Sequence, residues 1–195
     1  MNKNSLSTAV EALCKGEIIV YPTDTQYALG ADIYNEEAIK KVFKIKKRPY
    51  SQPFSVAVFD FKDLEKIAYT NEAVKKIVKK FLPGQLTLLL KKKKTISNLI
   101  TGNQDTIAVR IPKNEIALNL LSEFGPLTAT SANIHGKKTP YVINELTMQF
   151  RNEVSVYLDD GKLDQPASTI VDLTTKKPYL VRQGAISINE IKKVI

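Results

Sequence analysis

The chain has 195 residues, of which 43% are hydrophobic, so it can bury a core and is not an intrinsically disordered protein. Its 29 basic and 20 acidic side chains give a net charge of +9, which favours polyanionic partners such as nucleotides, RNA or phosphate groups. With one cysteine and one histidine, the chain can form no intramolecular disulfide and lacks the usual ligands of a zinc cluster.

Segments typical of strands and helices alternate along the whole chain. A short amphipathic helix comes first, with Leu6, Val10 and Leu13 on its apolar face, and we expect Cys14 to extend that face and to be buried. The later elements are expected in this order: strand 17–22, helix 35–48, strand 53–59, helix 71–81, strands 85–91 and 105–112, helix 114–125, strand 126–133, helix 141–150, strands 154–158, 168–173 and 179–182, and a helix from residue 187.

The fold class follows from this alternation. Asn35 and Asn71 stand at the N-cap positions of two expected helices. No repeat, low-complexity linker or charge block marks a boundary, which predicts one domain over residues 1–195. We therefore expect an α/β domain with a twisted sheet flanked by helices. Its pairing should be both parallel and antiparallel, because the last connections are short and lack helices.

Nothing in the sequence indicates a membrane protein. No segment approaches the roughly 18 consecutive apolar residues of a membrane helix, and the N-terminus has no apolar region of the signal-peptide type. We therefore expect a cytoplasmic protein without membrane partners.

Two segments place small polar side chains where strands end. They are YPTDTQYALGAD at 21–32 and PLTATSANIHGKKTP at 126–140. Hydroxyl and amide groups beside exposed backbone N–H groups suit phosphate or carboxylate binding, although an ordinary crossover or capped turn uses the same residue types. His135 in the second segment is expected to be exposed rather than catalytic.

A basic patch, formed by Lys44, Lys46, Lys47 and Arg48, ends the expected helix 35–48. Cations at this end stabilise the helix dipole by ~0.3–1 kcal/mol, but one or two charges are enough for that effect. The alternative is an anion site, in which the proline after Arg48 holds the chain rigidly.

Two other basic features differ from this patch. Arg110 ends an apolar strand, where it requires a carboxylate partner from the protein or from a ligand. The lysine run at 91–94 is expected to lie in a solvated loop that attracts polyanions.

Seven segments in order resemble the threonylcarbamoyl-AMP synthases of the YrdC-like family over nearly the whole chain. They are KGEIIVYPTDTQYALG, KIKKRP, PGQLTLLL, DTIAVRIP, ATSAN, STIVDL and VRQGAI. The family's Lys-x-Arg and Ser-x-Asn pairs are matched by Lys46, Arg48, Ser131 and Asn133. The resemblance implies a YrdC-like fold with a basic concave face.

The resemblance also implies an activity, the nucleotidyl transfer that condenses L-threonine, bicarbonate and ATP to threonylcarbamoyl-AMP and pyrophosphate for t6A37 modification of tRNA. It implies four catalytic residues, which are Lys46, Arg48, Ser131 and Asn133. The residues it implies for L-threonine are Thr25, Arg110, Ser131 and Ser168. Those it implies for ATP are Lys46, Arg48, Gln52, Thr106, Ala129, Asn133, Thr139 and Arg182.

Cofactor and partners follow from the same resemblance. Mg²⁺ is expected to accompany ATP, with no metal bound by the protein itself. The product would pass to a separate transferase that loads tRNA, and direct contact with tRNA or double-stranded RNA stays open. The alternative is a non-catalytic RNA-binding protein that uses the basic face, although the sequence lacks the interleaved aromatics of single-strand binders. The chain departs from common family residues at Ala28, Gln52, Ala57, Gln85 and Gln183.

Overall fold

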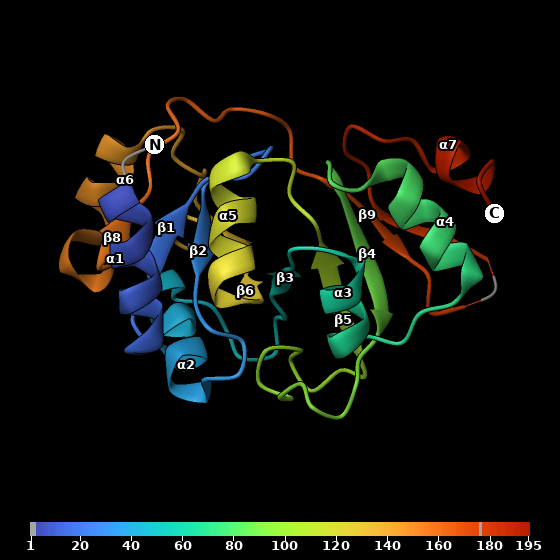
Figure 1. Cartoon of the computed structure of the whole chain (residues 1–195), viewed down its shortest axis with the longest axis horizontal. Helices are drawn as coiled ribbons and strands as arrows, with labels where there is room; N and C mark the ends of the chain where they lie inside the picture. Colours follow the sequence, from blue (N-terminus) through green and yellow to red (C-terminus); the bar gives the residue numbers. More distant parts are fainter. Residues whose placement is uncertain (1–2, 176) are drawn as a thin grey trace.

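The computed structural model describes residues 3–175 and 177–195, which form strands flanked by helices (Figure 1). The strands are β1 Ile19–Tyr21, β2 Ala28–Gly30, β3 Ser55–Ala57, β4 Leu86–Lys91, β5 Thr106–Arg110, β6 Leu127–Thr128, β7 Thr130–Ser131, β8 Val156–Tyr157, β9 Thr169–Asp172 and β10 Tyr179–Arg182. The helices are α1 Lys3–Cys14, α2 Glu36–Lys46, α3 Phe61–Ile67, α4 Glu72–Phe81, α5 Glu115–Phe124, α6 Ile143–Phe150 and α7 Ile188–Lys192, with a 3-10 turn η1 at Arg151–Glu153.

Within the described residues, the strands form two mixed sheets. The four-stranded sheet has the order β7-β2-β1-β8, and the six-stranded sheet has the order β10-β9-β4-β5-β3-β6. In the first sheet β1 is antiparallel to β2 and parallel to β8, and in the second β4 is antiparallel to β5 and parallel to β9. The expected α/β class with mixed pairing is therefore confirmed, although the strands divide between two sheets where one was expected.

Local signals account for where several helices begin. The side-chain oxygens of Asn35, Asn71 and Asn114 each accept a hydrogen bond from the backbone N–H three residues later, at 3.1, 2.9 and 3.0 Å. Each cap satisfies an amide that the helix itself leaves without a partner. The N-caps expected at Asn35 and Asn71 are confirmed.

Three segments differ from the expectation. β2 lies within a segment that looked like a plain crossover, because Ala28–Gly30 has no β-branched residue and is held by pairing with β1 and β7. Helix α3 was not expected, and Asp60 caps it. The strand expected at 126–133 divides into β6 and β7, which pair in different sheets on either side of Ala129.

The prediction that Cys14 is buried is wrong, because its side chain is exposed. Leu6 and Leu13 are buried in α1, whereas Val10 is only half-buried at the edge of that face. Cys14 lies one helical turn after Val10 and one residue after Leu13. Its side chain therefore lies beyond the edge of the apolar face and points to solvent.

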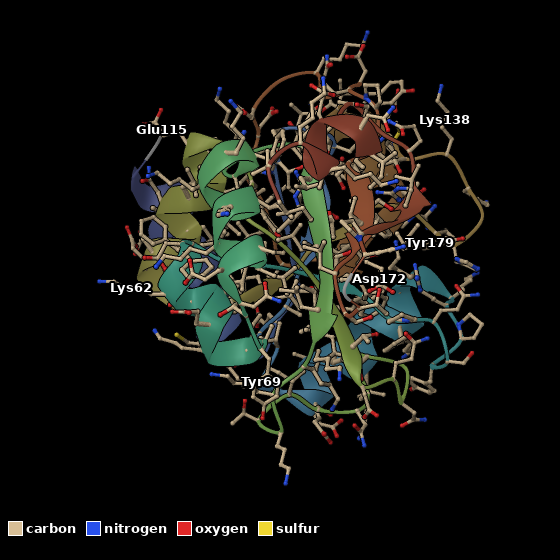
Figure 2. The ribbon with its side chains drawn as sticks, turned by 90° about the vertical axis from the view of Figure 1, so that its right-hand side faces the viewer. Lys62, Tyr69, Glu115, Lys138, Asp172 and Tyr179 are labelled. Carbon is tan, nitrogen blue, oxygen red and sulfur yellow. The ribbon has the colours of Figure 1, made fainter. Side chains whose placement is uncertain are left out.

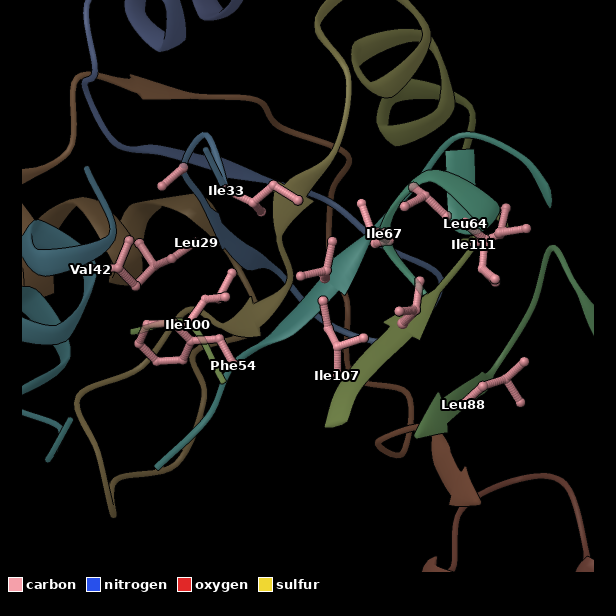
Figure 3. Close-up of a cluster of buried hydrophobic side chains, with 14 of the residues drawn as sticks. Leu29, Ile33, Val42, Phe54, Leu64, Ile67, Leu88, Ile100, Ile107 and Ile111 are labelled. Atoms are coloured by element: carbon pink, nitrogen blue, oxygen red, sulfur yellow. The ribbon is translucent and has the colours of Figure 1, made fainter. Parts of the chain in front are cut away.

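Apolar side chains from both sheets meet in one continuous cluster. Figure 3 shows Leu29 of β2 near Val42 of α2, with Phe54 and Ile107 extending the cluster toward Leu88 of β4. These five side chains are at most 2% exposed, so the two sheets share a core.

No helix in the described ranges is long and apolar enough to cross a bilayer.

Candidate functional site

A cavity of about 370 Å³ lies between the two sheets. The four-stranded sheet contributes residues of β2 and β7 to its wall, and the six-stranded sheet contributes residues of β3, β4, β5, β9 and β10. The lining residues are Thr23, Thr25, Gln26, Tyr27, Ala28, Arg48, Pro53, Phe54, Ser55, Thr87, Leu89, Gln104, Ala108, Arg110, Ala129, Thr130, Ser131, Ala167, Ser168, Ile170, Val181 and Arg182. Hydroxyl groups and guanidinium groups are thus gathered from segments far apart in the sequence.

Three guanidinium groups give the cavity its charge. Arg48, Arg110 and Arg182 all line it, while no carboxylate of the described residues does. Burial lowers the pKa of Arg48, and burial together with the nearby charge of Arg110 lowers the pKa of Arg182. Cations held this close together favour an anionic ligand that offsets their repulsion.

Arg110 is held by the segment that follows β1. Its Nη2 atom donates to Oδ1 of Asp24 at 2.5 Å, and its Nη1 atom donates to the hydroxyl of Thr25 at 3.2 Å. The hydroxyl of Thr25 lies 3.0 Å from that of Thr23. The expected carboxylate partner of Arg110 is therefore provided by the protein, and the hydroxyl groups lie directly beside the guanidinium.

Arg182 and Ser168 form a second polar group in the cavity lining. The Nε and Nη2 atoms of Arg182 donate to the carbonyl oxygen of Ser168 at 3.1 and 2.9 Å. The hydroxyl of Ser168 lies 2.8 Å from that of Thr87 on β4. The side chain of Arg182 thus joins the edge strand β10 to the start of β9 at the cavity.

Arg48 lines the cavity beside an aromatic ring. Its Nη2 atom donates to the carbonyl oxygen of Pro53 at 2.9 Å, its Nε atom donates to that of Gln52 at 3.3 Å, and its guanidinium lies 5.3 Å from the ring centroid of Phe54. These hydrogen bonds do not use Nη1, and Arg48 is one of the residues that line the cavity.

Lys46 is buried behind the cavity rather than exposed in it. Its ammonium donates to the carbonyl oxygen of Ser131 and, at 2.9 and 3.1 Å, to the carbonyl and side-chain oxygens of Asn133. Burial, with a contribution from Arg48, lowers the pKa of Lys46 to about 7. Three acceptors use all three N–H groups of an ammonium, so Lys46 holds the loop after β7.

The side chain of Asn133 completes this arrangement. Its Oδ1 atom accepts from the hydroxyl of Ser131 at 2.6 Å, and its Nδ2 atom donates to the carbonyl oxygens of Ile134 and Lys137. Ser131 lines the cavity, whereas Asn133 does not. The Lys-x-Arg and Ser-x-Asn pairs therefore do lie together, with Arg48 and Ser131 at the cavity and Lys46 and Asn133 behind it.

The remaining residues expected at the site divide in the same way. Thr25, Arg110, Ala129, Ser168 and Arg182 line the cavity. Gln52, Thr106 and Thr139 are half-buried and lie outside the lining. The exposed position expected for His135 is confirmed.

Several lining residues were not anticipated from the sequence. Phe54, Thr87 and Gln104 belong to segments read only as strand or loop, and Asp24 stands within the polar segment 21–32 without having been singled out. A threonine facing inward from an otherwise apolar strand, as Thr87 does, was the one available signal.

A metal ion bound by the protein itself would need a group of carboxylate, imidazole or thiolate ligands. In the described part of the chain no three His, Cys, Asp or Glu side chains lie together as a metal ligand group. The cavity offers guanidinium and hydroxyl groups, which suit anions rather than Mg²⁺.

Comparison with known proteins gives a consistent picture. Residues 11–184 match the Sua5/YciO/YrdC family model, described as "Telomere recombination". A putative threonylcarbamoyl-AMP synthase of Methanocaldococcus jannaschii is 38% identical over 192 residues, covering 98% of this chain and 91% of that protein.

Two solved structures have the same fold over almost all of this chain. Pyrococcus abyssi Sua5 complexed with L-threonine matches with a TM-score of 0.91 and 37% identity, over 97% of this chain and 57% of that one. Escherichia coli YciO matches with a TM-score of 0.88 and 30% identity, over 95% of this chain and 92% of that one. This chain therefore spans a little over half of the Pyrococcus protein and nearly all of YciO.

Proposed function

The chain belongs to the Sua5/YciO/YrdC family, and on that premise we propose that it is an L-threonylcarbamoyladenylate synthase. The reaction condenses L-threonine, bicarbonate and ATP to threonylcarbamoyl-AMP and pyrophosphate, for the t6A37 modification of tRNA. One observation carries the proposal, a cavity with three guanidinium groups and a set of hydroxyl groups but no lining carboxylate from the described residues. The relative complexed with L-threonine supports the same reading.

The amino-acid end of the reaction fits the wall formed by Arg110, Thr25 and Ser168. A guanidinium can bind the carboxylate of threonine, and the hydroxyl groups of Thr25 and Ser168 can bind its polar atoms. The amine of threonine then attacks bicarbonate, with loss of water, to form a carbamate. This step needs the amine to be deprotonated and held close to bicarbonate.

The nucleotide end fits the side of Arg48, Ser131 and Arg182. An oxygen of the carbamate attacks the α-phosphorus of ATP, and pyrophosphate leaves with the electrons of the broken P–O bond. Two anions must approach each other, so cations that surround them lower the barrier. Gln52, Thr106, Ala129 and Thr139 are the further residues we assign to ATP.

Lys46 and Asn133 act on this chemistry through the loop that they hold. The loop begins at Ser131 in the cavity wall and is tied to Lys46 by three hydrogen bonds.

Mg²⁺ bound to the phosphates of ATP would supply further charge neutralisation. The product is unstable in water, which favours direct transfer to the enzyme that loads tRNA.

The test is incubation with ATP, L-threonine and labelled bicarbonate, followed by separation of a labelled adenylate and measurement of pyrophosphate. We expect pyrophosphate release that depends on threonine, and a labelled adenylate in equal amount. The family also includes YciO, whose name states no activity, so family membership alone does not establish the reaction and this measurement is needed. No threonine-dependent release over a range of magnesium concentrations would refute the proposal.

RNA binding without catalysis is the second candidate function. Two cation–aromatic pairs favour it, because Lys93 lies 5.9 Å from the ring of the exposed Tyr69, and the exposed Lys138 lies 4.7 Å from that of Tyr141. However, Tyr69 and Lys138 lie at opposite ends of the molecule in Figure 2, so the pairs do not make one groove. A binding measurement with tRNA tests this candidate and also tests direct contact with tRNA. Tight binding together with no turnover would favour the RNA-binding candidate.

A further inference from the structure

The ion pair of Asp24 and Arg110 is the least solvent-exposed one in the described part of the chain. The two side chains are 8% and 7% exposed, and the separation of their nearest atoms is 2.5 Å. The other ion pairs found there, such as Lys40 with Glu37, involve partners that are much more exposed. A buried pair of this kind contributes little net stability, so its position next to the cavity calls for a functional reason.

The segment that carries Asp24 is fixed on both sides. Gln85 donates its Nε2 hydrogen to the carbonyl oxygen of Asp24 at 3.0 Å, and the backbone N–H of Lys113 donates to Oδ1 of Asp24 at 3.2 Å. Asp24 is therefore tied to the start of β4 and to the residues after β5. Arg110 itself is the last residue of β5, so both partners have a fixed backbone.

The contact between them uses only part of each group. Asp24 binds through Oδ1 alone, while its Oδ2 atom and the Nε atom of Arg110 are buried without a hydrogen-bond partner in the described residues. A bidentate pair would satisfy both atoms and would consume one whole edge of the guanidinium. The monodentate contact instead fixes Nη2, directs Nη1 to Thr25 and leaves donor capacity for a ligand.

We infer that Asp24 is a positioning residue, which orients the guanidinium of Arg110 so that Arg110 and Thr25 together receive the carboxylate of an α-amino acid substrate. This inference rests on the proposed function. Asp24 itself does not line the cavity, and it acts through Arg110. It would therefore affect binding of the amino acid and not of the nucleotide.

The experiment compares Asp24→Asn and Asp24→Ala with the wild type and with Asp32→Asn. Asp32 is a suitable control because its Oδ1 atom also accepts a backbone N–H, at 2.9 Å, but it is outside the cavity lining. The readouts are the KM for threonine, the KM for ATP and kcat, with threonine affinity measured separately by calorimetry. Thermal melting shows whether each variant is folded.

We expect the KM for threonine to rise roughly 10- to 100-fold in Asp24→Ala and by a smaller factor in Asp24→Asn, because hydrogen bonds to charged groups are of that strength. The KM for ATP should stay unchanged, and Asp32→Asn should behave as the wild type. A variant that is only less stable would not separate the two KM values.

Two outcomes would overturn the inference while the proposed function stands. Unchanged threonine affinity in a folded Asp24→Asn would show that Arg110 needs no partner. Tighter threonine binding in that variant would show that Asp24 competes with the substrate's carboxylate for Arg110. Failure of the proposed function is recognised separately, as a wild-type protein that releases no pyrophosphate.

Discussion

Lys46 is a lysine whose surroundings differ strongly from those of a lysine on the surface. It is 1% exposed and donates to three oxygens of the loop 131–133. Its pKa in the folded protein, about 7, lies below its ordinary value of 10.5, because burial disfavours the charged form. Between these two pH values the unfolded chain binds a proton that the folded chain does not.

This difference predicts a pH dependence of stability. The free energy of unfolding should rise with pH between about 7 and 10.5, by at most about 1.4 kcal/mol per pH unit, and the contribution should be constant below pH 7. Lys46→Met should remove the slope. The check is urea unfolding of both proteins from pH 6 to 9, and parallel pH profiles in the two would contradict it.

Arg48 lines the cavity, whereas Lys44 and Lys47 of the same basic patch are exposed and do not. We expect Arg48→Ala to reduce turnover roughly 100-fold, since a cation beside the transferring phosphate is lost. Loss of its hydrogen bonds to the carbonyl oxygens of Gln52 and Pro53 should also cost about 1–2 kcal/mol of stability. Steady-state kinetics and urea unfolding measure the two effects.

Lys44 and Lys47 are the matched controls for Arg48. Both are exposed and belong to the same basic patch, so Lys44→Ala and Lys47→Ala should leave turnover near that of the wild type. Equal losses in all three variants would mean that the patch acts only through its summed charge.

Residue identity was easier to predict from the sequence than residue environment. Asn35 and Asn71 were recognisable as caps because the amides they bind are three residues away. The acceptors of Lys46 lie 85 and 87 residues away, so no local pattern could show that its ammonium is fully engaged. The same holds for Asp24, whose partner Arg110 is 86 residues away.

Among the elements, the turn that follows β10, at Gly184, packs closely against the start of β9. A Cβ atom on Gly184 would collide with the backbone of Ala167, Ser168 and Thr169. The hydroxyl of Thr169 accepts from the N–H groups of Gly184 and Ile186 at 3.0 Å each and donates to the carbonyl oxygen of Ile186 at 2.7 Å. This turn sets the position of β10, and with it that of Arg182.

Gly184→Ala should therefore destabilise the protein by about 3 kcal/mol, because rigid backbone atoms cannot move away from the new methyl group. Gly161→Ala is the control: it has a φ of 74° but no atom near the added Cβ, so only backbone strain of about 1 kcal/mol applies. Urea unfolding of the two variants tests the difference. Similar costs at both positions would contradict the packing argument.

Secondary structure was predictable where an element carries its own signal. Helix α4, with its cap and apolar stripe, was expected at 71–81 and is found at Glu72–Phe81. Strands of two or three residues have too few side chains for such a signal. β6 and β7 were merged into one strand because membership of a sheet depends on partners such as β3 and β2 that are remote in sequence.

At the scale of the whole molecule, the cavity joins the two sheets. Its wall takes residues from both, and the two sheets also share an apolar core. A ligand bound in the cavity contacts residues of both sheets at once. Only the folded protein brings these residues together, so the ligand binds the folded state and not the unfolded chain.

Substrates should consequently raise the melting temperature. At 100 times its Kd, a ligand stabilises the folded state by about 2.7 kcal/mol, which for a chain of this size is a shift of roughly 5–10 °C. We expect ATP with threonine to give a larger shift than either alone, measured by thermal unfolding. Unchanged melting at millimolar concentrations of both would contradict a binding site between the sheets.

Ala129 connects the two sheets by the shortest route. Thr128 before it pairs with Val56 in the six-stranded sheet, Thr130 after it pairs with Leu29 in the four-stranded sheet, and its own N–H donates to the carbonyl oxygen of Ser55 at 2.7 Å. One inserted or deleted residue here would shift one sheet by a register position and turn Ser131 away from the cavity.

The loop 159–167 is different, because it runs along the edge of the molecule between the two halves in Figure 1 and can absorb changes in length. Relatives of this chain should therefore vary in length along 159–167 and keep an unbroken alignment through 127–131.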